Sequence, residues 1–397
     1  MTECFEYRDD RGKTPFDPPP RYEQLREERP VSQVSMFDGS KVWLVTRYAD
    51  VCAVLADQRF SADNQKPNFP LFSARSENLT QDDPAFVRMD PPEHGRLRGM
   101  VASEFTPKRA EAMRPLVQQI VDRFVDGMVA QSPPVDLVSQ FALPVPTAVI
   151  CQLLGVAYED HGFFHECSAT MMNGADEAAI DAASVEMTRF LAEVVEKKAK
   201  QPADDIISRL VVEQERRGEL GRDEVVSMAR ALLIPGYETT SMMIALGVAA
   251  LLYHPAQLAA LRDKPALVPG AVEELLRYLT IVHTGLPRIA ASDAEVGGQH
   301  IRAGEGVVCY LPSANRDGER YRNPEVLDVT RSKRANVAFG YGLHRCIAQW
   351  LARVELEVVL ETLNRRLPTL DLAIGFDQVS FRQQMLVYGV FELPVTW

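Results

Sequence analysis

The chain has 397 residues, of which 46% are hydrophobic and 25% are charged, a balance typical of a folded globular protein. Its 43 Lys and Arg residues stand against 55 Asp and Glu, a formal net charge of −12, so a general nucleic-acid-binding surface is not expected. The six cysteines form no Cys-x-x-Cys pair, which argues against a disulfide scaffold or a zinc ribbon and favours a reducing compartment.

The first 25 residues carry charges and prolines, where a signal peptide or membrane anchor needs an apolar stretch. No later window offers about 20 uninterrupted apolar residues. No flexible linker or internal repeat divides the chain. We therefore expect one domain over residues 1–397 in a soluble, cytoplasmic monomer that binds neither membrane nor nucleic acid.

Strand signals occur early in the chain, over residues 41–46, before amphipathic patterns of helical period take over. Helices are predicted over residues 107–129, 187–200, 223–253, 265–279 and 347–366. Strand patterns return over residues 294–310 and 379–396. The fold is therefore predicted to be mainly α with a small β region.

The helix predicted over residues 223–253 would be about 45 Å long, and its middle is apolar on nearly every face. Inside it lie Pro235, Gly236 and Glu238. A proline removes a backbone donor and crowds the preceding turn, and a buried glutamate needs a partner. The pattern indicates a kink where the helix is most buried, and a tolerated structural kink is an equally good interpretation.

A glycine-containing loop is expected to deliver Cys346 to the first turn of the helix predicted over residues 347–366. A helix N-terminus and the neighbouring Arg345 favour a thiolate over a thiol. Such a thiolate is a nucleophile or a metal ligand, although a lone buried cysteine is more often a packing residue.

The pattern Phe339-Gly340-x-Gly342-x-His344-x-Cys346 resembles the haem-binding loop of the cytochrome P450 family, and further family motifs follow in order along almost the whole chain. The resemblance implies a single-domain cytochrome P450 fold, with haem b (iron protoporphyrin IX) between the long kinked distal helix and the proximal Cys-loop helix. It makes Cys346 the iron ligand and places Phe339, Gly340 and Ala348 against the haem. Ala348 replaces the usual glycine, and Asn336 replaces a histidine that often precedes this loop.

By the same resemblance, the segment from Pro235 to Thr239 is the family's oxygen-activating segment. Glu238 and Thr239 would then relay protons to dioxygen, the co-substrate. Pro235 stands where the family usually has a small residue.

Two further groups of residues match family positions. Glu274, Arg277 and Arg331 resemble a structural ion network that supports the cysteine loop. The partners implied for the haem propionates, which need charge-assisted hydrogen bonds, are His94, Arg98, Arg288 and His344.

The resemblance implies a monooxygenase that hydroxylates or epoxidises a lipophilic small molecule, a polyketide or macrolide natural product, with electrons from NAD(P)H. No Gly-x-Gly-x-x-Gly motif indicates a nicotinamide or flavin site in this chain, so a ferredoxin reductase and a ferredoxin would supply the electrons. The residues proposed to dock the ferredoxin are Arg345, Lys108, Arg109 and Arg96.

Two alternatives remain open. One is a haem-thiolate enzyme for oxidative coupling or peroxide-driven chemistry, against which Glu238 and Thr239 argue. The other is a non-catalytic haem-binding ligand sensor, which only turnover with a ferredoxin pair distinguishes from an enzyme.

The expected substrate pocket is apolar and rich in methionine, as suits an adaptable site, although the same residues fit plain core packing. One candidate segment is residues 60–86, which contains Phe72. The other candidate residues are Met171, Ile234, Val282, Thr284, Met385 and Leu386.

Overall fold

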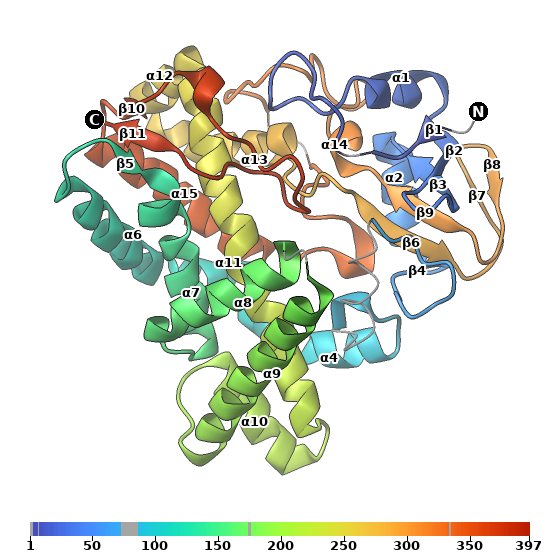
Figure 1. Ribbon diagram of the computed structural model, residues 1–397, viewed down its shortest axis with the longest axis horizontal. Coiled ribbons are helices and arrows are strands. Elements are labelled where there is room, and N and C mark those ends of the chain that lie inside the picture. Colours follow the sequence, from blue (N-terminus) through green and yellow to red (C-terminus); the bar gives the residue numbers. More distant parts are fainter. Residues whose placement is uncertain (1–2, 7, 73–85, 174–175, 333–334) are drawn as a thin grey trace.

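The computed structural model describes residues 3–397 except residues 7, 73–85, 174–175 and 333–334. Helices make up most of the described chain (Figure 1). They are α1 (Arg21–Glu28), α2 (Tyr48–Ala56), α4 (Glu93–Ala102), α5 (Pro107–Ala112), α6 (Arg114–Val129), α7 (Pro144–Leu154), α8 (His161–Asn173), α9 (Glu177–Lys200), α10 (Ile206–Arg217), α11 (Arg222–Tyr253), α12 (Pro255–Asp263), α13 (Val268–Leu279), α14 (Leu311–Ala314) and α15 (Gln349–Arg366).

The strands are short and lie at the side of the helical body, most of them beside α1 and α2 (Figure 1). One sheet has the order β1-β2-β3-β9-β6-β4, and two smaller sheets pair β10-β11-β5 and β7-β8. Their bounds are β1 (Glu3–Cys4), β2 (Val31–Ser35), β3 (Lys41–Val45), β4 (Phe60–Ser61), β5 (Val135–Asp136), β6 (Leu286–Ala290), β7 (Ala294–Val296), β8 (Gln299–Ile301), β9 (Gly306–Cys309), β10 (Asp371–Leu372) and β11 (Pro394–Thr396).

Helix α11 runs through the middle of the molecule (Figure 1) and is unbroken through Pro235. Among the described residues it is the one helix long and apolar enough to cross a membrane, but 72% of its most apolar window is buried in the protein. Gly236 allows α7 to pack closely against it, because a Cβ there would lie 2.9 Å from the side chain of Ile150. The helix is therefore the core around which the other helices assemble.

The predicted helices exist, but several predicted bounds were wrong: α9, for example, begins at Glu177 and not at residue 187. The stretch predicted as one helix over residues 107–129 is two helices, since α5 ends at Ala112 and α6 begins at Arg114 with Pro115 in its first turn. A proline has no N–H to continue the preceding helix. The predicted strand over residues 379–396 is strand only at β11, with an isolated bridge between Phe381 and Val390.

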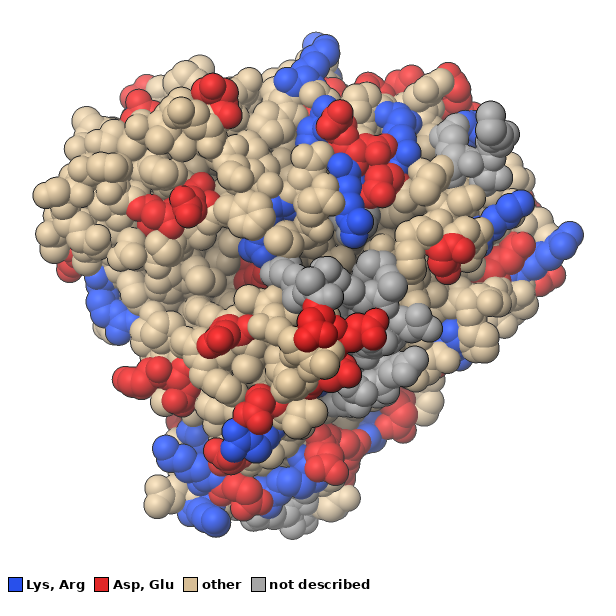
Figure 2. Space-filling model, in the orientation of Figure 1, with Lys and Arg blue, Asp and Glu red and all other residues tan. Residues whose placement is uncertain are grey.

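The surface shows no single large basic area on the face drawn in Figure 2, where acidic and basic side chains are interspersed.

Candidate active site

The cysteine loop is built from short backbone hydrogen bonds and two left-handed glycines. The N–H of Cys346 donates to the carbonyl of Phe339 at 2.9 Å, and the N–H of Gly340 donates to Val337 at 2.8 Å. Gly340 and Gly342 have φ of +71° and +69°, values that favour glycine. A Cβ on Gly342 would lie 2.3 Å from the carbonyl oxygen of Leu55 on α2, so this glycine also lets the loop pack against that helix.

The prediction that Cys346 occupies the first helical turn was wrong. Helix α15 begins at Gln349, with Ala348 as its N-cap residue. Burial raises the pKa of the Cys346 thiol, and this effect outweighs a hydrogen bond from the Ala348 backbone and the charges of Arg98, Arg353 and Arg345, which lower it. Desolvation disfavours a thiolate, so a positively charged partner at the sulfur is needed to hold it ionised.

One cavity joins the cysteine loop to α11. Its wall includes Cys346, Ala348 and Phe339 on the loop side and Gly236 and Thr239 on α11. The remaining lining side chains are mostly apolar: Phe105, Val149, Ile150, Leu232, Met243, Leu276, Ile281, Val282, Leu286, Leu311, Leu351 and Leu356. The sulfur and the Thr239 hydroxyl therefore belong to the same largely apolar chamber.

Thr239 and Glu238 are held differently. The Thr239 hydroxyl donates to the carbonyl of Pro235 at 2.9 Å. Glu238 is absent from the cavity lining and forms an ion pair with Arg382, 3.0 Å from Nη2 to Oε1. Burial raises the pKa of Glu238, and Arg382 opposes that rise. The sequence analysis missed Arg382, which lies 144 residues further along the chain.

The four predicted propionate partners gather at one side of this cavity. The rings of His94 and His344 have centroids 4.1 Å apart, and Arg98 Nη2 donates to the carbonyl of Arg345 at 2.7 Å. The charge of Arg288 acts on both histidines. Burial lowers the pKa of His344 to about 3 and also lowers the pKa of His94.

Three of the four ring nitrogens of His94 and His344 have no hydrogen-bond partner among the residues that the structure describes. Among the described residues, neither ring nitrogen of His94 and not the Nδ1 of His344 has a hydrogen-bond partner. Buried polar groups are normally paired. Unpaired donors grouped beside the cysteine cavity fit a ligand with carboxylates at its edge.

Glu274, Arg277 and Arg331 form one ion network. Both oxygens of Glu274 accept hydrogen bonds from Arg277 at 2.8 Å and from Arg331 at 3.0 Å. Arg277 Nη1 also donates to the backbone carbonyls of Asn315 and Pro324. The network is placed to fix the segments before the cysteine loop, and it does not line the cavity.

Glu355 is a cavity residue that the sequence analysis missed. It lies on α15 and lines the chamber, with its Oε2 unpartnered among the described residues. Burial raises the pKa of this carboxyl group to about 8. Its position nine residues after Cys346, two helical turns into α15, was the available signal.

Of the predicted substrate residues, the structure places Val282 in the cavity wall. Phe72 packs instead beside Phe5, with ring centroids 6.0 Å apart. Met171 and Ile234 pack in or against the apolar cluster that joins α9 and α10 to the cavity wall, but neither residue lines the cavity itself. Thr284, Met385 and Leu386 are also absent from the lining of this cavity. Part of the predicted segment 60–86 falls outside the described residues.

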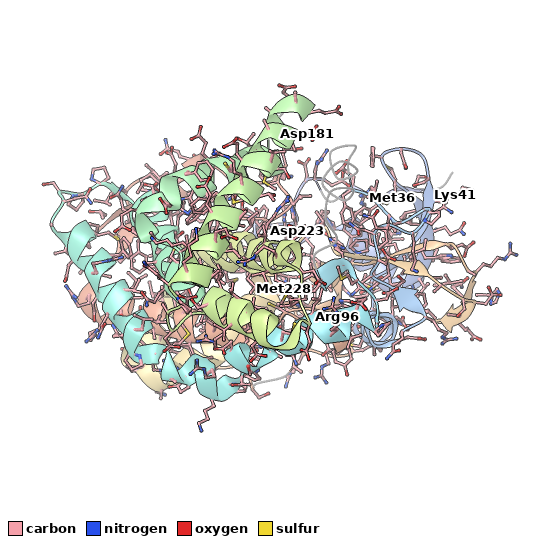
Figure 3. All side chains as sticks on the ribbon, turned by 90° about the horizontal axis from the view of Figure 1, so that it is seen from below. Met36, Lys41, Arg96, Asp181, Asp223 and Met228 are labelled. Carbon is pink, nitrogen blue, oxygen red and sulfur yellow. The ribbon has the colours of Figure 1, made fainter. Side chains whose placement is uncertain are left out.

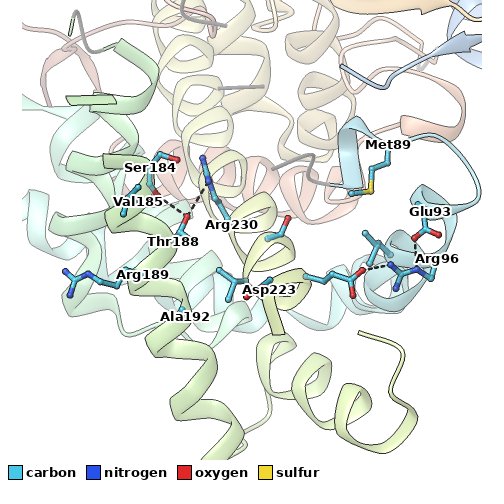
Figure 4. A pocket seen from close by; sticks show the side chains of 14 residues that line it. Met89, Glu93, Arg96, Ser184, Val185, Thr188, Arg189, Ala192, Asp223 and Arg230 are labelled. Atoms are coloured by element: carbon cyan, nitrogen blue, oxygen red, sulfur yellow. Dashed lines mark hydrogen bonds and ion pairs between the residues drawn. The ribbon is translucent and has the colours of Figure 1, made fainter. Parts of the chain in front are cut away.

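Two of the predicted docking residues are engaged elsewhere. Arg96 lines a separate cleft of about 800 Å³ between α4, α9 and α11 (Figure 4), beside the start of α11 (Figure 3), where it pairs with Glu93 and Glu224. Arg109 pairs with Glu104 at 2.9 Å. Arg345 lines a groove over the cysteine loop together with Trp350, which is 39% exposed.

The chamber fits haem. A cysteine sulfur lies in one wall, the α11 hydroxyl lies in another, apolar side chains fill the rest, and unpaired imidazoles lie at the edge where two carboxylates need donors. The cysteine suits the iron as an axial ligand, and the unpaired imidazoles suit the propionates as hydrogen-bond donors.

Comparisons with known proteins agree with this fit. The family model Cytochrome P450 matches residues 163–368. Cytochrome P450-SU2 from Streptomyces griseolus is 50% identical over 96% of this chain and 94% of its own length. Pentalenic acid synthase from Streptomyces avermitilis is 48% identical over 96% of this chain and 95% of its own length.

Solved structures give the same answer. The crystal structure of GfsF covers 100% of both chains with a TM-score of 0.93 and 45% identity. The structure of MycCI, the mycinamicin VIII C21 methyl hydroxylase of Micromonospora griseorubida bound to mycinamicin VIII, covers 96% of both chains with a TM-score of 0.89 and 40% identity. The chain belongs to the cytochrome P450 family and is a monooxygenase, an oxidoreductase that uses haem b with dioxygen as co-substrate.

Proposed function

We propose that this protein inserts one oxygen atom of dioxygen into a lipophilic natural product of the polyketide or macrolide type, by hydroxylation or epoxidation, with electrons delivered by a ferredoxin and its reductase in the cytoplasm. The observation that carries the proposal is the single chamber shared by Cys346 and Thr239, with mostly apolar walls. The hydroxylation of mycinamicin VIII by MycCI supports the substrate class.

Cys346 would hold the haem iron from the proximal side, and haem supplies oxygen activation when bound. The Ala348 N–H, donated to the Cys346 sulfur, stabilises negative charge on that sulfur. His94, Arg98, Arg288 and His344 would hold the two propionates through charge-assisted hydrogen bonds.

Thr239 lines the chamber and donates its hydroxyl proton to the Pro235 carbonyl, while Glu238 does not line the chamber and pairs with Arg382. We assign proton delivery to this pair: Glu238 collects protons near the Arg382 guanidinium, and Thr239 presents them in the cavity. The apolar walls exclude water from the rest of the chamber.

The ferredoxin is proposed to dock on the groove of Arg345 and Trp350, above the cysteine loop. Arg345→Glu reverses a charge in this groove and should slow reduction by a ferredoxin at low ionic strength without changing substrate affinity. Arg189→Glu on α9 is the matched control, because Arg189 lies at the separate cleft. Equal reduction rates for the wild type and Arg345→Glu would reject this docking site.

The iron ligand is tested by spectroscopy. Reduced wild-type protein under carbon monoxide should show the long-wavelength Soret band of sulfur-ligated haem, and Cys346→Ser should lose it. Cys4→Ser, at an exposed cysteine, should keep it. A Cys346→Ser protein with the wild-type spectrum would overturn the proposal.

The proton relay is tested by measuring how much of the consumed electron supply ends in product and how much ends in hydrogen peroxide. Thr239→Ala removes the hydroxyl from the cavity and should raise hydrogen peroxide release per electron pair at the expense of product. Thr239→Ser, which keeps the hydroxyl in the cavity, is the control and should keep normal coupling. Unchanged coupling in Thr239→Ala would contradict the relay.

A further inference from the structure

Part of the chamber wall is a short loop, residues 280–285, between the end of α13 and the start of β6. Ile281 and Val282 of this wall loop line the chamber. His283 follows them directly but is absent from the lining, and it is only 1% exposed. Its ring is therefore buried behind the wall, where it can affect the chamber only through the position of the loop.

The imidazole of His283 connects the wall loop to two distant parts of the chain. Arg11 Nη2, from the N-terminal segment (residues 8–17), donates to Nδ1 at 3.0 Å. Nε2 donates to the backbone carbonyl of Met385 at 2.6 Å. Because an arginine only donates and a carbonyl only accepts, the ring is neutral and carries its proton on Nε2. One side chain thus joins the N-terminal segment, the chamber wall and the C-terminal part of the chain.

Met385 belongs to a C-terminal hairpin (residues 381–390), which is closed by the bridge between Phe381 and Val390. The hairpin is bonded to the wall loop a second time, because the Tyr388 N–H donates to the carbonyl of Ile281 at 2.9 Å. Near its start, Arg382 forms the ion pair with Glu238 of α11. The hairpin is therefore held between the wall loop and α11.

The N-terminal segment packs on both of these connections. The guanidinium of Arg11 lies over the ring of Tyr388, with Cζ 3.6 Å from the ring centroid, a favourable cation–π contact. The Tyr388 hydroxyl donates to the carbonyl of Pro15 at 2.6 Å. Gln383 Nε2 donates to the carbonyls of residues 8 and 9 at 3.0 and 2.9 Å. Arg11 thus contacts His283 and Tyr388, the two residues through which the hairpin is bonded to the wall loop.

We propose that His283 is a positioning residue, which together with Arg11 fixes where Ile281 and Val282 stand in the chamber wall and so determines which position of a substrate is oxidised. The inference rests on the proposed function, because the wall can select a position only in a substrate that is oxidised in this chamber. The physical basis is that misplacing a reacting group by about 1 Å can cost about 100-fold in rate. In a mostly apolar chamber, the shape of the wall sets that placement.

The test removes the hydrogen bonds from either side. His283→Phe keeps a buried ring and loses both bonds, whereas His283→Gln keeps one acceptor and one donor on its amide. Arg11→Met keeps the apolar stem and loses the N-terminal donor. His300→Phe is the matched control, because the His300 side chain on β8 is 62% exposed and lies beside Asp293.

Two quantities are measured on the haem-loaded proteins. The dissociation constants of 1-phenylimidazole and 4-phenylimidazole are titrated by the Soret shift. These probes share one nitrogen donor and one phenyl ring but carry the ring at different positions, so the ratio of their dissociation constants reports the shape of the wall and not the stability of the fold. Hydrogen exchange of the wall loop and the hairpin is followed by mass spectrometry.

His283→Phe should change the ratio at least fivefold and speed exchange at the hairpin at least tenfold. Arg11→Met should change the ratio in the same direction, and it decides the question if His283→Phe does not fold. His283→Gln should stay within twofold of wild type in the ratio, and His300→Phe should leave both quantities unchanged.

The proposal is overturned if His283→Phe keeps the wild-type ratio, even with faster exchange, because His283 then only stabilises the fold. It is also overturned if His283→Gln changes the ratio as much as His283→Phe does, or if wild type binds neither probe. The carbon monoxide spectrum separates this inference from the proposed function. A sulfur-ligated spectrum with an unchanged ratio rejects only the role of His283, whereas its absence in wild type rejects the function and this inference with it.

Discussion

Two groups of buried charges flank the cysteine chamber, and they differ in whether the chain completes them. Arg277 is 2% exposed and Arg288 is 4% exposed, so burial does not distinguish them. Arg277 bonds both oxygens of Glu274 and three backbone carbonyls. Arg288 bonds the carbonyl of its own neighbour and lies beside histidines with unpaired nitrogens.

The difference shows how to distinguish a buried charge that stabilises the fold from a buried charge that binds a ligand. A buried ion whose partners all come from the chain holds segments in place and needs nothing else. A buried cation whose partners are missing costs stability until a ligand supplies them. We infer that the first group fixes the fold, and we propose that the second group binds an anion.

The largest effect is expected from breaking the ion network of Glu274, Arg277 and Arg331, in which every charge has partners from the chain. Arg277→Ala leaves Glu274 buried with Arg331 as its remaining charged partner, a change that costs about 3–5 kcal/mol of unfolding free energy. We expect little folded, haem-loaded protein, measured by Soret absorbance per mole of chain and by urea unfolding. Arg365→Ala, at an exposed arginine 3.7 Å from Asp122, is the control. A stable, fully loaded Arg277→Ala protein would refute the structural role.

Local patterns in the sequence predicted the features that depend on neighbours along the chain. The long apolar helix, the glycine-containing loop and its cysteine all follow from spacing and composition within about 30 residues. The break before α6 was also readable, because Pro115 lies in its first turn, but amphipathic periodicity continued across it and hid the boundary.

Features that depend on tertiary packing could not be predicted in this way. The pairing of Glu238 with Arg382 spans 144 residues, and no local pattern distinguishes Arg382 from a surface arginine. The pKa of Cys346 was predicted with the wrong sign, because the helix N-terminus was visible in the sequence and the extent of burial was not.

A buried histidine with both nitrogens paired gives the next test. Arg11 Nη2 donates to Nδ1 of His283 at 3.0 Å, and Nε2 donates to the carbonyl of Met385 at 2.6 Å. Since an arginine cannot accept and a carbonyl cannot donate, His283 is neutral and protonated at Nε2. Burial and the charge of Arg11 lower its pKa to about 3.

The pH dependence follows from that shift. The unfolded chain protonates His283 near pH 6.5, and the folded chain does so near pH 3, so stability is lost as pH falls through this window. At pH 5 the loss is about 2 kcal/mol. Urea unfolding should show His283→Gln less stable than wild type at pH 7.5, with a gap about 2 kcal/mol smaller at pH 5. A gap independent of pH would mean that His283 titrates normally in the folded protein.

The smallest of these effects is expected at Arg288, which lies beside the unpaired histidines. Whether its loss stabilises or destabilises the haem-free chain tests the difference between the two groups of charges. Arg288→Gln removes one donor to a bound carboxylate, and a hydrogen bond to a charged group contributes about 1.5 kcal/mol. Haem transfer to apomyoglobin should therefore be about tenfold faster, while the free energy of unfolding of the haem-free chain should not fall, because an unpaired buried charge has been removed. Arg277→Ala should lower both. If Arg288→Gln instead destabilises the haem-free chain by as much as Arg277→Ala does, Arg288 has partners within the chain, and the distinction between complete and incomplete charge groups does not hold for this protein.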